Sequence, residues 1–404
     1  MKHRLCIILF CIFAPLWIYP AQLLDWQTCS QEALSQNLDV QSAQKAVLKT
    51  ETELGISDSD YLPQLNLSGT YAQTTSEGTT STALTLSQKL FPGLNSKPEM
   101  QRAKAHLKEA QATLKSVISQ LKADLVTAFA QLKYTQDAIK LNQYIADRRT
   151  QNANLVHARY LAGREHKGSY LRAQAQADQA MLEVKQTQRD LDIARESLCV
   201  LLNKPVSDSF AVTGEIKLDP LPQNPPFDTL LLDTPSVIQA QAKLEASLAD
   251  QTITSQSYDP SITASYALSQ TLFGSSEGTG RLSLSIPLYN GSKGSYDRES
   301  AKLSLTIAEI ALSQAKNQVR LDLKKAWVSA LDTLENVAMQ NTLVTVALIR
   351  SEIAEAQYNT GILSFDNWDI IENDLISQQK LALINQRNAS TSLASFENIQ
   401  GKGF

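Results

Sequence analysis

The 404-residue chain has little glycine and little proline, with 15 and 13 residues respectively, and the prolines are unevenly placed. No proline lies between Pro98 and Pro205, and none follows Pro287. An internal proline removes a helical hydrogen bond and clashes with the preceding turn, so long proline-free stretches favour long helices. With 43% hydrophobic and 19% charged residues, the composition excludes both a disordered chain and a helical membrane bundle.

Cysteine and histidine are also scarce, with four of each. Cys29 and Cys199 are too few for a disulfide framework, and we expect two unpaired thiols in preference to a bridge. The histidines are scattered, and no catalytic or metal-binding constellation is present, so the sequence predicts neither an enzyme nor a cofactor. The net charge of −4 argues against nucleic acid as a partner.

The first 21 residues read as a signal peptide. Lys2, His3 and Arg4 give a basic start, and an uncharged apolar stretch runs from Leu5 to Phe13. This stretch is short for a membrane span, and we place the cleavage after Ala21. The sequence thus predicts export, and no later segment has about 18 consecutive apolar residues that would form a spanning helix.

An internal repeat determines how the remainder is read. At an offset of 198 residues, Ala158, Tyr160 and Gly163 coincide with Ala356, Tyr358 and Gly361. The hydrophobic spacing repeats as well, in steps of four and three that are typical of a helix packed in coiled-coil fashion. The two matching sets are Ala103, Leu107, Ala110, Leu114, Val117, Leu121, Leu125, Ala128 and Leu132, and Ala301, Leu305, Ala308, Leu312, Ala315, Val319, Leu323, Ala326 and Ala330. The helix expected from Glu99 to Ala162 would be about 96 Å long, which predicts an elongated molecule.

Each repeat also contains runs in which apolar and small polar residues alternate. One run holds Leu282, Leu284, Ile286 and Leu288; the others lie around residues 65–71, 84–87 and 262–269. Alternation over about ten residues is typical of a transmembrane β-strand, apolar toward lipid and polar toward a lumen, although soluble hairpins remain an alternative. The tetrapeptides Ser76–Thr79 and Ser276–Thr279 are expected to be the hairpin loops. Four strands cannot close a barrel alone, so the pattern requires several copies of the chain.

These features divide the chain as follows. Residues 1–21 are the signal peptide, and 22–204 are the first repeat, with a helix, a hairpin at about 61–91 and long helices at about 95–203. Residues 205–235, the stretch richest in proline, are an equatorial linker. Residues 236–404 are the second repeat, with a helix, a hairpin at about 258–290 and long helices at about 295–400.

This duplicated order of helix, hairpin and long helices resembles the TolC-like outer-membrane efflux protein family over essentially the whole mature chain. The local matches are Arg159–Gly163 and Gln357–Gly361. The resemblance implies an α+β membrane protein: a homotrimer that forms a 12-stranded transmembrane β-barrel in outer-membrane lipid, continued by a periplasmic α-helical barrel. It also implies two partners, a periplasmic adaptor (membrane fusion) protein and an inner-membrane pump.

The same resemblance places the candidate site residues. The tyrosine and glycine pairs, Tyr160 with Gly163 and Tyr358 with Gly361, fall at the periplasmic tip, where Arg164 and Ser364 would meet the adaptor. Family members commonly carry acidic residues six and nine positions after the second tip glycine, ringing the entrance. Here Asp366 and Asp369 stand five and eight positions after Gly361 and are the candidate pore constriction; Glu372 and Asp374 extend the acidic patch.

The expected function is a passive exit duct of a tripartite efflux pump or type I secretion system in the outer membrane, exporting drugs, small molecules or polypeptides. The alternative is a secreted, non-transporting coiled-coil stalk with soluble hairpins. The strand pattern discriminates between them, because a stalk has no need of an apolar face on all four strands.

Overall fold

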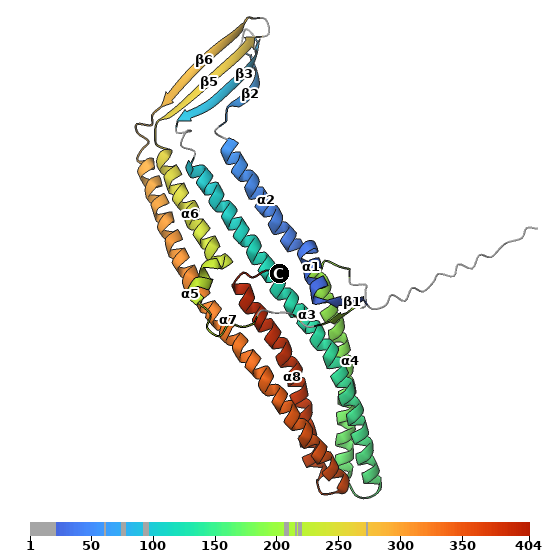
Figure 1. The fold of residues 1–404 in the computed structure, drawn as a ribbon. Coiled ribbons are helices and arrows are strands. Elements are labelled where there is room, and N and C mark those ends of the chain that lie inside the picture. Colours follow the sequence, from blue (N-terminus) through green and yellow to red (C-terminus); the bar gives the residue numbers. More distant parts are fainter. Residues whose placement is uncertain are drawn as a thin grey trace, which may run out of the picture.

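The computed structural model describes residues 22–59, 62–73, 78–91, 97–205, 210–214, 216, 220–271 and 274–404, so the predicted signal peptide lies outside the described residues. The molecule is elongated, with a sheet at one end and helices that run from it to two turns at the other (Figure 1). The helices are α1 (Trp26–Gln36), α2 (Leu38–Ser59), α3 (Lys97–Leu161), α4 (Lys167–Leu201), α5 (Phe227–Leu230), α6 (Pro235–Gln256), α7 (Lys293–Thr360) and α8 (Phe365–Ile399). The strands are β1 (Gln22–Asp25), β2 (Gln64–Gln73), β3 (Gly78–Phe91), β4 (Phe210–Thr213), β5 (Ser261–Thr271) and β6 (Ser276–Ser285).

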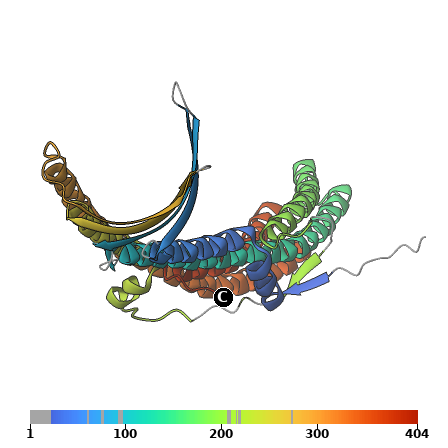
Figure 2. The ribbon, with the colours of Figure 1, turned by 90° about the horizontal axis from the view of Figure 1, so that it is seen from above.

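The two predicted hairpins join into one antiparallel sheet with the order β2-β3-β5-β6. Leu67 pairs with Leu84, and Leu84 pairs with Leu268, so the apolar residues of both hairpins share one face. The other face carries mainly serine, threonine and alanine, as the alternation predicted. The sheet is strongly curved when viewed along the molecule (Figure 2).

The tetrapeptide Ser276–Thr279 was expected to form a hairpin loop, and this prediction is wrong. Strand β6 begins at Ser276, which pairs with Gln270, and Thr279 pairs with Ala267. Gly278 is needed for a close approach rather than for a turn, because a Cβ atom there would lie 2.5 Å from the hydroxyl of Tyr266. In the first copy the corresponding residues 76–77 lie outside the described residues.

The alternating run at the end of the second hairpin is also shorter than expected. The strand stops at Ser285, whereas the apolar alternation continues through Ile286 to Leu288. Pro287 lacks the N–H group that a ladder needs, and α7 begins soon afterwards at Lys293. Gly291 and Ser292 both have positive φ values, 68° each, at this junction between sheet and helix.

Helix α3 is the centre of the helical part and packs against α2, α4, α6 and α8. Small residues repeat every seven positions along one of its buried faces, at Ala105, Ala112 and Ser119, and allow close helix approach. The predicted apolar seam of α3 lies on another side, and none of its nine residues is exposed. A helix with neighbours on several sides needs more than one such seam.

Helix α7 lies at one edge of the helical layer and packs against α6 and α8. All nine predicted seam residues of α7 are buried or half-buried, including Leu312, Val319 and Leu323. The predicted periodicity is therefore the packing face of this helix. Among the described residues, no helix is both long enough and apolar enough to cross a membrane.

A small subdomain joins the N-terminal segment to the linker. Strand β1 pairs in parallel with β4 of the linker, with Leu24 opposite Val212. Asn37 separates α1 from α2: its side-chain oxygen accepts hydrogen bonds from the backbone N–H groups of Asp39 and Val40 at 3.0 and 3.2 Å, as a helix N-cap does. Cys29 and Cys199 both lie buried in the core beneath.

Candidate functional site at the helical tip

Two helical turns form the end of the molecule opposite the sheet (Figure 1). Gly163 follows α3 with φ 71°, and Gly361 caps α7 with φ 83°. The N–H of Ile362 donates to the carbonyl of Gln357 at 2.9 Å, and the N–H of Arg164 donates to that of Arg159 at 2.9 Å. Equivalent glycines of the two repeats thus end these helices in the left-handed conformation. This conformation costs residues other than glycine conformational energy.

The turns are held together by an aromatic core. The Tyr358 ring stacks on Trp368 of α8 with centroids 4.4 Å apart, and the Arg159 guanidinium lies 4.4 Å above Tyr358. Arg159 Nη1 also donates to the Tyr358 carbonyl oxygen at 2.5 Å. Burial, together with the nearby Glu165 carboxylate, raises the pKa of Tyr358 to about 12. Tyr358 therefore stays neutral at physiological pH. Its contacts with Arg159 connect the second repeat to the first.

A buried ionic cluster lies above the aromatic core, on the side toward the sheet. Arg148 of α3 binds Glu372 of α8 through two bonds, Nε to Oε2 at 2.7 Å and Nη2 to Oε1 at 2.8 Å. Ser351 of α7 donates a hydrogen bond to the same carboxylate, and the Glu372 side chain is only 1% exposed. The hydrogen bond to Glu372 raises the pKa of Arg148 above its ordinary value. A two-pronged, buried pair of this kind fixes the relative position of the helices that carry it.

Asp369 forms the second half of the ionic cluster. Its carboxylate is 1% exposed and lies 3.1 Å from Arg149 Nη1 and 2.8 Å from Arg172 Nη2. Gln176 of α4 donates to it at 3.1 Å. The cluster as a whole therefore draws one member or more from each of the four helices that meet at the tip.

The structure separates the predicted site residues into two groups. Gly163, Arg164, Gly361, Ser364 and Asp366 are exposed at the tip, with Ser364 accepting from the Asn367 N–H at 3.4 Å as the N-cap of α8. Tyr160 is half-buried and stacks on Tyr170. Tyr358 and Asp369 are buried, so neither presents a free side chain at the surface of the chain. Of the two candidate constriction residues, Asp366 is exposed and Asp369 is buried, because two arginines enclose the latter.

Sequence reasoning missed Arg148, Arg149 and the exposed apolar residues of the turns. Each arginine pairs with a residue more than 200 positions away, and no local spacing signals such a pair. Leu161 and Ile362, 73% and 78% exposed, could have been placed at the tip from the sequence, since both stand within two positions of a turn glycine. A hollow of about 670 Å³ lies between the turns, lined by residues that include Arg159, Glu165, Ile362 and Asp366.

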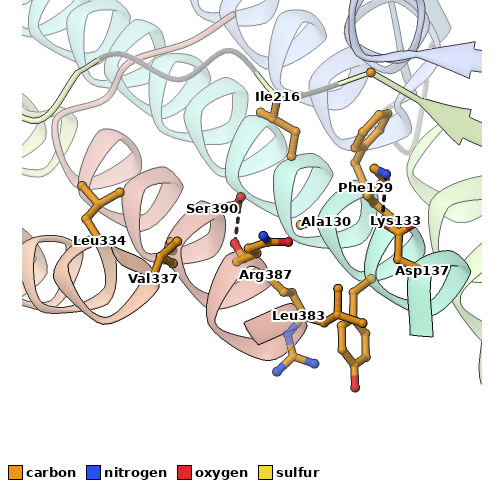
Figure 3. A pocket seen from close by; sticks show the side chains of 14 residues that line it. Phe129, Ala130, Lys133, Asp137, Ile216, Leu334, Val337, Leu383, Arg387 and Ser390 are labelled. Atoms are coloured by element: carbon orange, nitrogen blue, oxygen red, sulfur yellow. Dashed lines mark hydrogen bonds and ion pairs between the residues drawn. The ribbon is translucent and has the colours of Figure 1, made fainter. Parts of the chain in front are cut away.

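A second hollow, of about 410 Å³, lies midway along the molecule between α3, α7, α8 and the linker (Figure 3). Phe129, Leu334 and Leu383 give it apolar walls, while Lys133 and Asp137 are paired at 2.8 Å on one side. The Arg387 guanidinium lies 4.9 Å from the Tyr134 ring. Within the described residues, no three His, Cys, Asp or Glu side chains are grouped so as to hold a metal ion.

The fold thus combines an open, curved sheet, a long helical layer that continues it, and paired turns at the far end. Residues 29–204 match the model of the outer membrane efflux protein family. Nodulation protein T of Rhizobium leguminosarum bv. trifolii is 23% identical over 396 residues, covering 91% of this chain and 82% of that protein. The probable outer membrane lipoprotein SilC of Salmonella typhimurium is 24% identical over 401 residues, covering 90% and 84%.

The fold agrees with these matches. The crystal structure of CusC superposes with a TM-score of 0.84 at 18% identity, covering 93% of this chain and 92% of that chain. The chain therefore resembles the outer membrane efflux protein family in sequence over residues 29–204, and it shares the fold of CusC over 93% of its length. The matched family and the structural neighbours are outer-membrane channels and not enzymes.

Proposed function

We propose that three copies of this chain close into a 12-stranded β-barrel in outer-membrane lipid, continued by a periplasmic α-helical tube. The assembly is the passive exit duct of a tripartite exporter. The observation that carries this proposal is the open sheet: β2 and β6 are its edges and have no strand partner among the described residues. Unpaired edge groups are prohibitively costly in lipid, so closure by further copies is required.

The two faces of the sheet support a membrane location. One face carries large apolar side chains that are 37–77% exposed in the chain alone: Leu65, Leu67, Tyr71, Leu84, Leu86, Tyr266, Leu268, Leu282 and Leu284. Lipid would cover this face without any change in fold. The small polar residues of the other face, such as Ser68, Thr85 and Ser265, suit a water-filled lumen. A secreted, non-transporting stalk would not need a sheet with one apolar and one polar face.

Helix α7 supports closure of the tube. Leu303, Ile307 and Ile310 are 55%, 66% and 53% exposed, and each lies two positions from a residue of the buried seam. At about 3.6 residues per turn, positions two apart face opposite sides of a helix. Helix α7 thus carries a second apolar stripe pointing away from its own chain, as expected of a wall helix that meets a neighbouring copy.

The tips are the proposed docking surface for the periplasmic adaptor. Leu161 and Ile362 add apolar area to the polar residues Arg164 and Ser364 on the same two turns. The adaptor would connect the duct to an inner-membrane pump, which selects the cargo, whether drugs, other small molecules or polypeptides. Asp366 is the remaining candidate for the acidic ring at the entrance, since it is 68% exposed.

Mass measurement of the detergent-solubilised protein tests the assembly. We expect about three times the mass of the mature protomer. A water-soluble monomer would contradict both the barrel and the duct. Restoration of efflux in cells that lack their own duct, measured by retention of a fluorescent pump substrate, tests the transport function separately.

A further inference from the structure

Only three charged residues occur in the four strands of the sheet: Lys89 in β3, and Glu277 and Arg281 in β6. The pairing register places all three on one face. Lys89 pairs with Thr263, Arg281 with Ser265 and Glu277 with Ser269, and these three partners alternate along β5 on its polar side. Leu268 and Tyr266, between them in sequence, point to the apolar side.

The charged face is the concave one. On the two inner strands, the polar-face residues Ser81, Ala83, Thr85 and Ser87 of β3 and Ser265, Ala267 and Ser269 of β5 are half-buried. Their neighbours on the apolar face, Leu84, Leu86, Tyr266 and Leu268, are exposed. Side chains crowd together on the inside of a curve and spread on the outside, and the sheet is visibly curved (Figure 2). All three charges therefore point toward the inside of the curve.

The two cations lie at nearly the same level of the sheet. Across β5, Lys89 is level with Thr263 and Arg281 with Ser265, a difference of two residues or about 7 Å along the strand. Both are near the end of β5 that follows α6, and so near the helical tube. Glu277 precedes Arg281 by four residues in β6. It therefore lies about 13 Å nearer the end of the sheet that is farthest from the helices.

Neither cation is neutralised within the described part of the chain. No ion pair of Lys89 or Arg281 with a described residue is present, and β2 and β5 carry no charge at all. In the proposed trimer, β6 of one copy would meet β2 of the next, which adds no carboxylate beside Arg281. Outside the strands, the acidic residue closest in sequence to this end of β5 is Asp259, two positions before the strand begins.

We propose that Lys89 and Arg281 form a belt of six cations around the inside of the barrel, next to its junction with the tube. The inference rests on the trimer of the proposed function. Basic side chains on a wall that carries little other charge attract anions, and multivalent anions most strongly. The belt is a binding site for anionic solutes that carry phosphate or several carboxylate groups, and it favours anions over cations at this level of the duct.

Single-channel recording in a planar bilayer tests the belt, with inorganic tripolyphosphate added on the extracellular side. From that side the anion reaches the belt without passing the tips. We expect wild-type channels to be blocked, and the half-blocking concentration to rise roughly tenfold or more in the double variant K89Q/R281Q, because the attraction is electrostatic. The exchange K89R/R281K keeps both charges and should keep the block. Glu277→Gln removes the one anion of the wall and should strengthen it.

The outcomes separate the belt from the duct. A wild-type channel that conducts but is not blocked, or a block that survives in K89Q/R281Q, overturns the belt and leaves the duct in place. A protein that forms no channel overturns the proposed function and the belt with it. Loss of the block in K89R/R281K as well as in K89Q/R281Q would show that shape, rather than charge, produces it, and would also overturn the belt.

Discussion

At the scale of single residues, the contact that matters most for the tip is the pair of Arg148 and Glu372. Glu372→Gln would remove the buried carboxylate partner of Arg148 and leave only Glu355, which lies 3.2 Å away and is 44% exposed. Removal of one partner of a buried pair costs up to about 3 kcal/mol. We expect a lower thermal unfolding midpoint, and faster amide hydrogen exchange in the first turns of α8.

The matched control for this change is Asp374→Asn. Asp374 pairs with Arg350 at 3.2 Å only two residues further along α8, but both side chains are partly exposed, 37% and 57%. Exposed pairs contribute between about 0 and 1 kcal/mol. Equal destabilisation by the two substitutions would mean that the ionic cluster does not hold the tip helices together.

Tyr358 predicts an alkaline transition at the tip. Its folded-state pKa of about 12 lies above the ordinary value of 10.0, because burial disfavours the phenolate. A raised pKa means that the stability from the neutral ring is fully present below pH 10 and is lost as pH rises through about 12. Tyr358→Phe should remove one late-titrating group from the tyrosinate absorbance of the folded protein. Loss of a group that titrates near the ordinary value of 10.0 would instead place Tyr358 in contact with water.

At the scale of elements, the left-handed glycines end the long helices and set the geometry of both turns. Gly361→Val should reduce export while leaving the oligomer intact. The site has room for a side chain, since the nearest atom to an added Cβ would be Arg159 Nη2 at 3.6 Å, but a branched residue at φ 83° is strained. Export of a fluorescent substrate and the mass in detergent measure the two effects. Gly55→Ala in α2, also unobstructed and without a positive φ, is the control that should leave both unchanged.

The helices, the hairpins and the turn glycines were predictable because their signals are local and occur twice. The seam of α7 required only the spacing of Ala301 to Ala330, and the turns required only a glycine after a long helix. Interactions between distant parts of the chain gave no such signal. Asp369 looked like a free carboxylate because Arg149 and Arg172, which enclose it, lie about 200 residues earlier. Gly278 looked like a loop residue because its reason, the ring of Tyr266, lies on another strand.

At the scale of the whole molecule, duplication gives the chain two unlike edges. On one side are β2 and the helices α2 and α4, and on the other are β6 and α7. Since the edges differ, neighbouring copies in the proposed trimer would join head to tail, a contact that closes into a ring when its rotation divides a full turn. The same curvature is visible in the sheet and the helical layer (Figure 2).

The exposed stripe of α7 predicts how this ring can be prevented from forming. The double substitution of Ile307 and Ile310 by glutamate would place two charges where the next copy is expected to pack, while the seam of the chain itself, on the opposite side of the helix, is untouched. Burying two uncompensated carboxylates costs more than the apolar contacts of one helical turn can offset. We expect the detergent-solubilised variant to be monomeric with the helical content of the wild type, by mass measurement and circular dichroism.

Ser313→Glu, an exposed position on the flank of the stripe, should leave the oligomer intact. A double variant that still assembles would show that copies meet through another surface of α7 or not through α7 at all. The proposed closure of the tube would then have to use different edges of the chain.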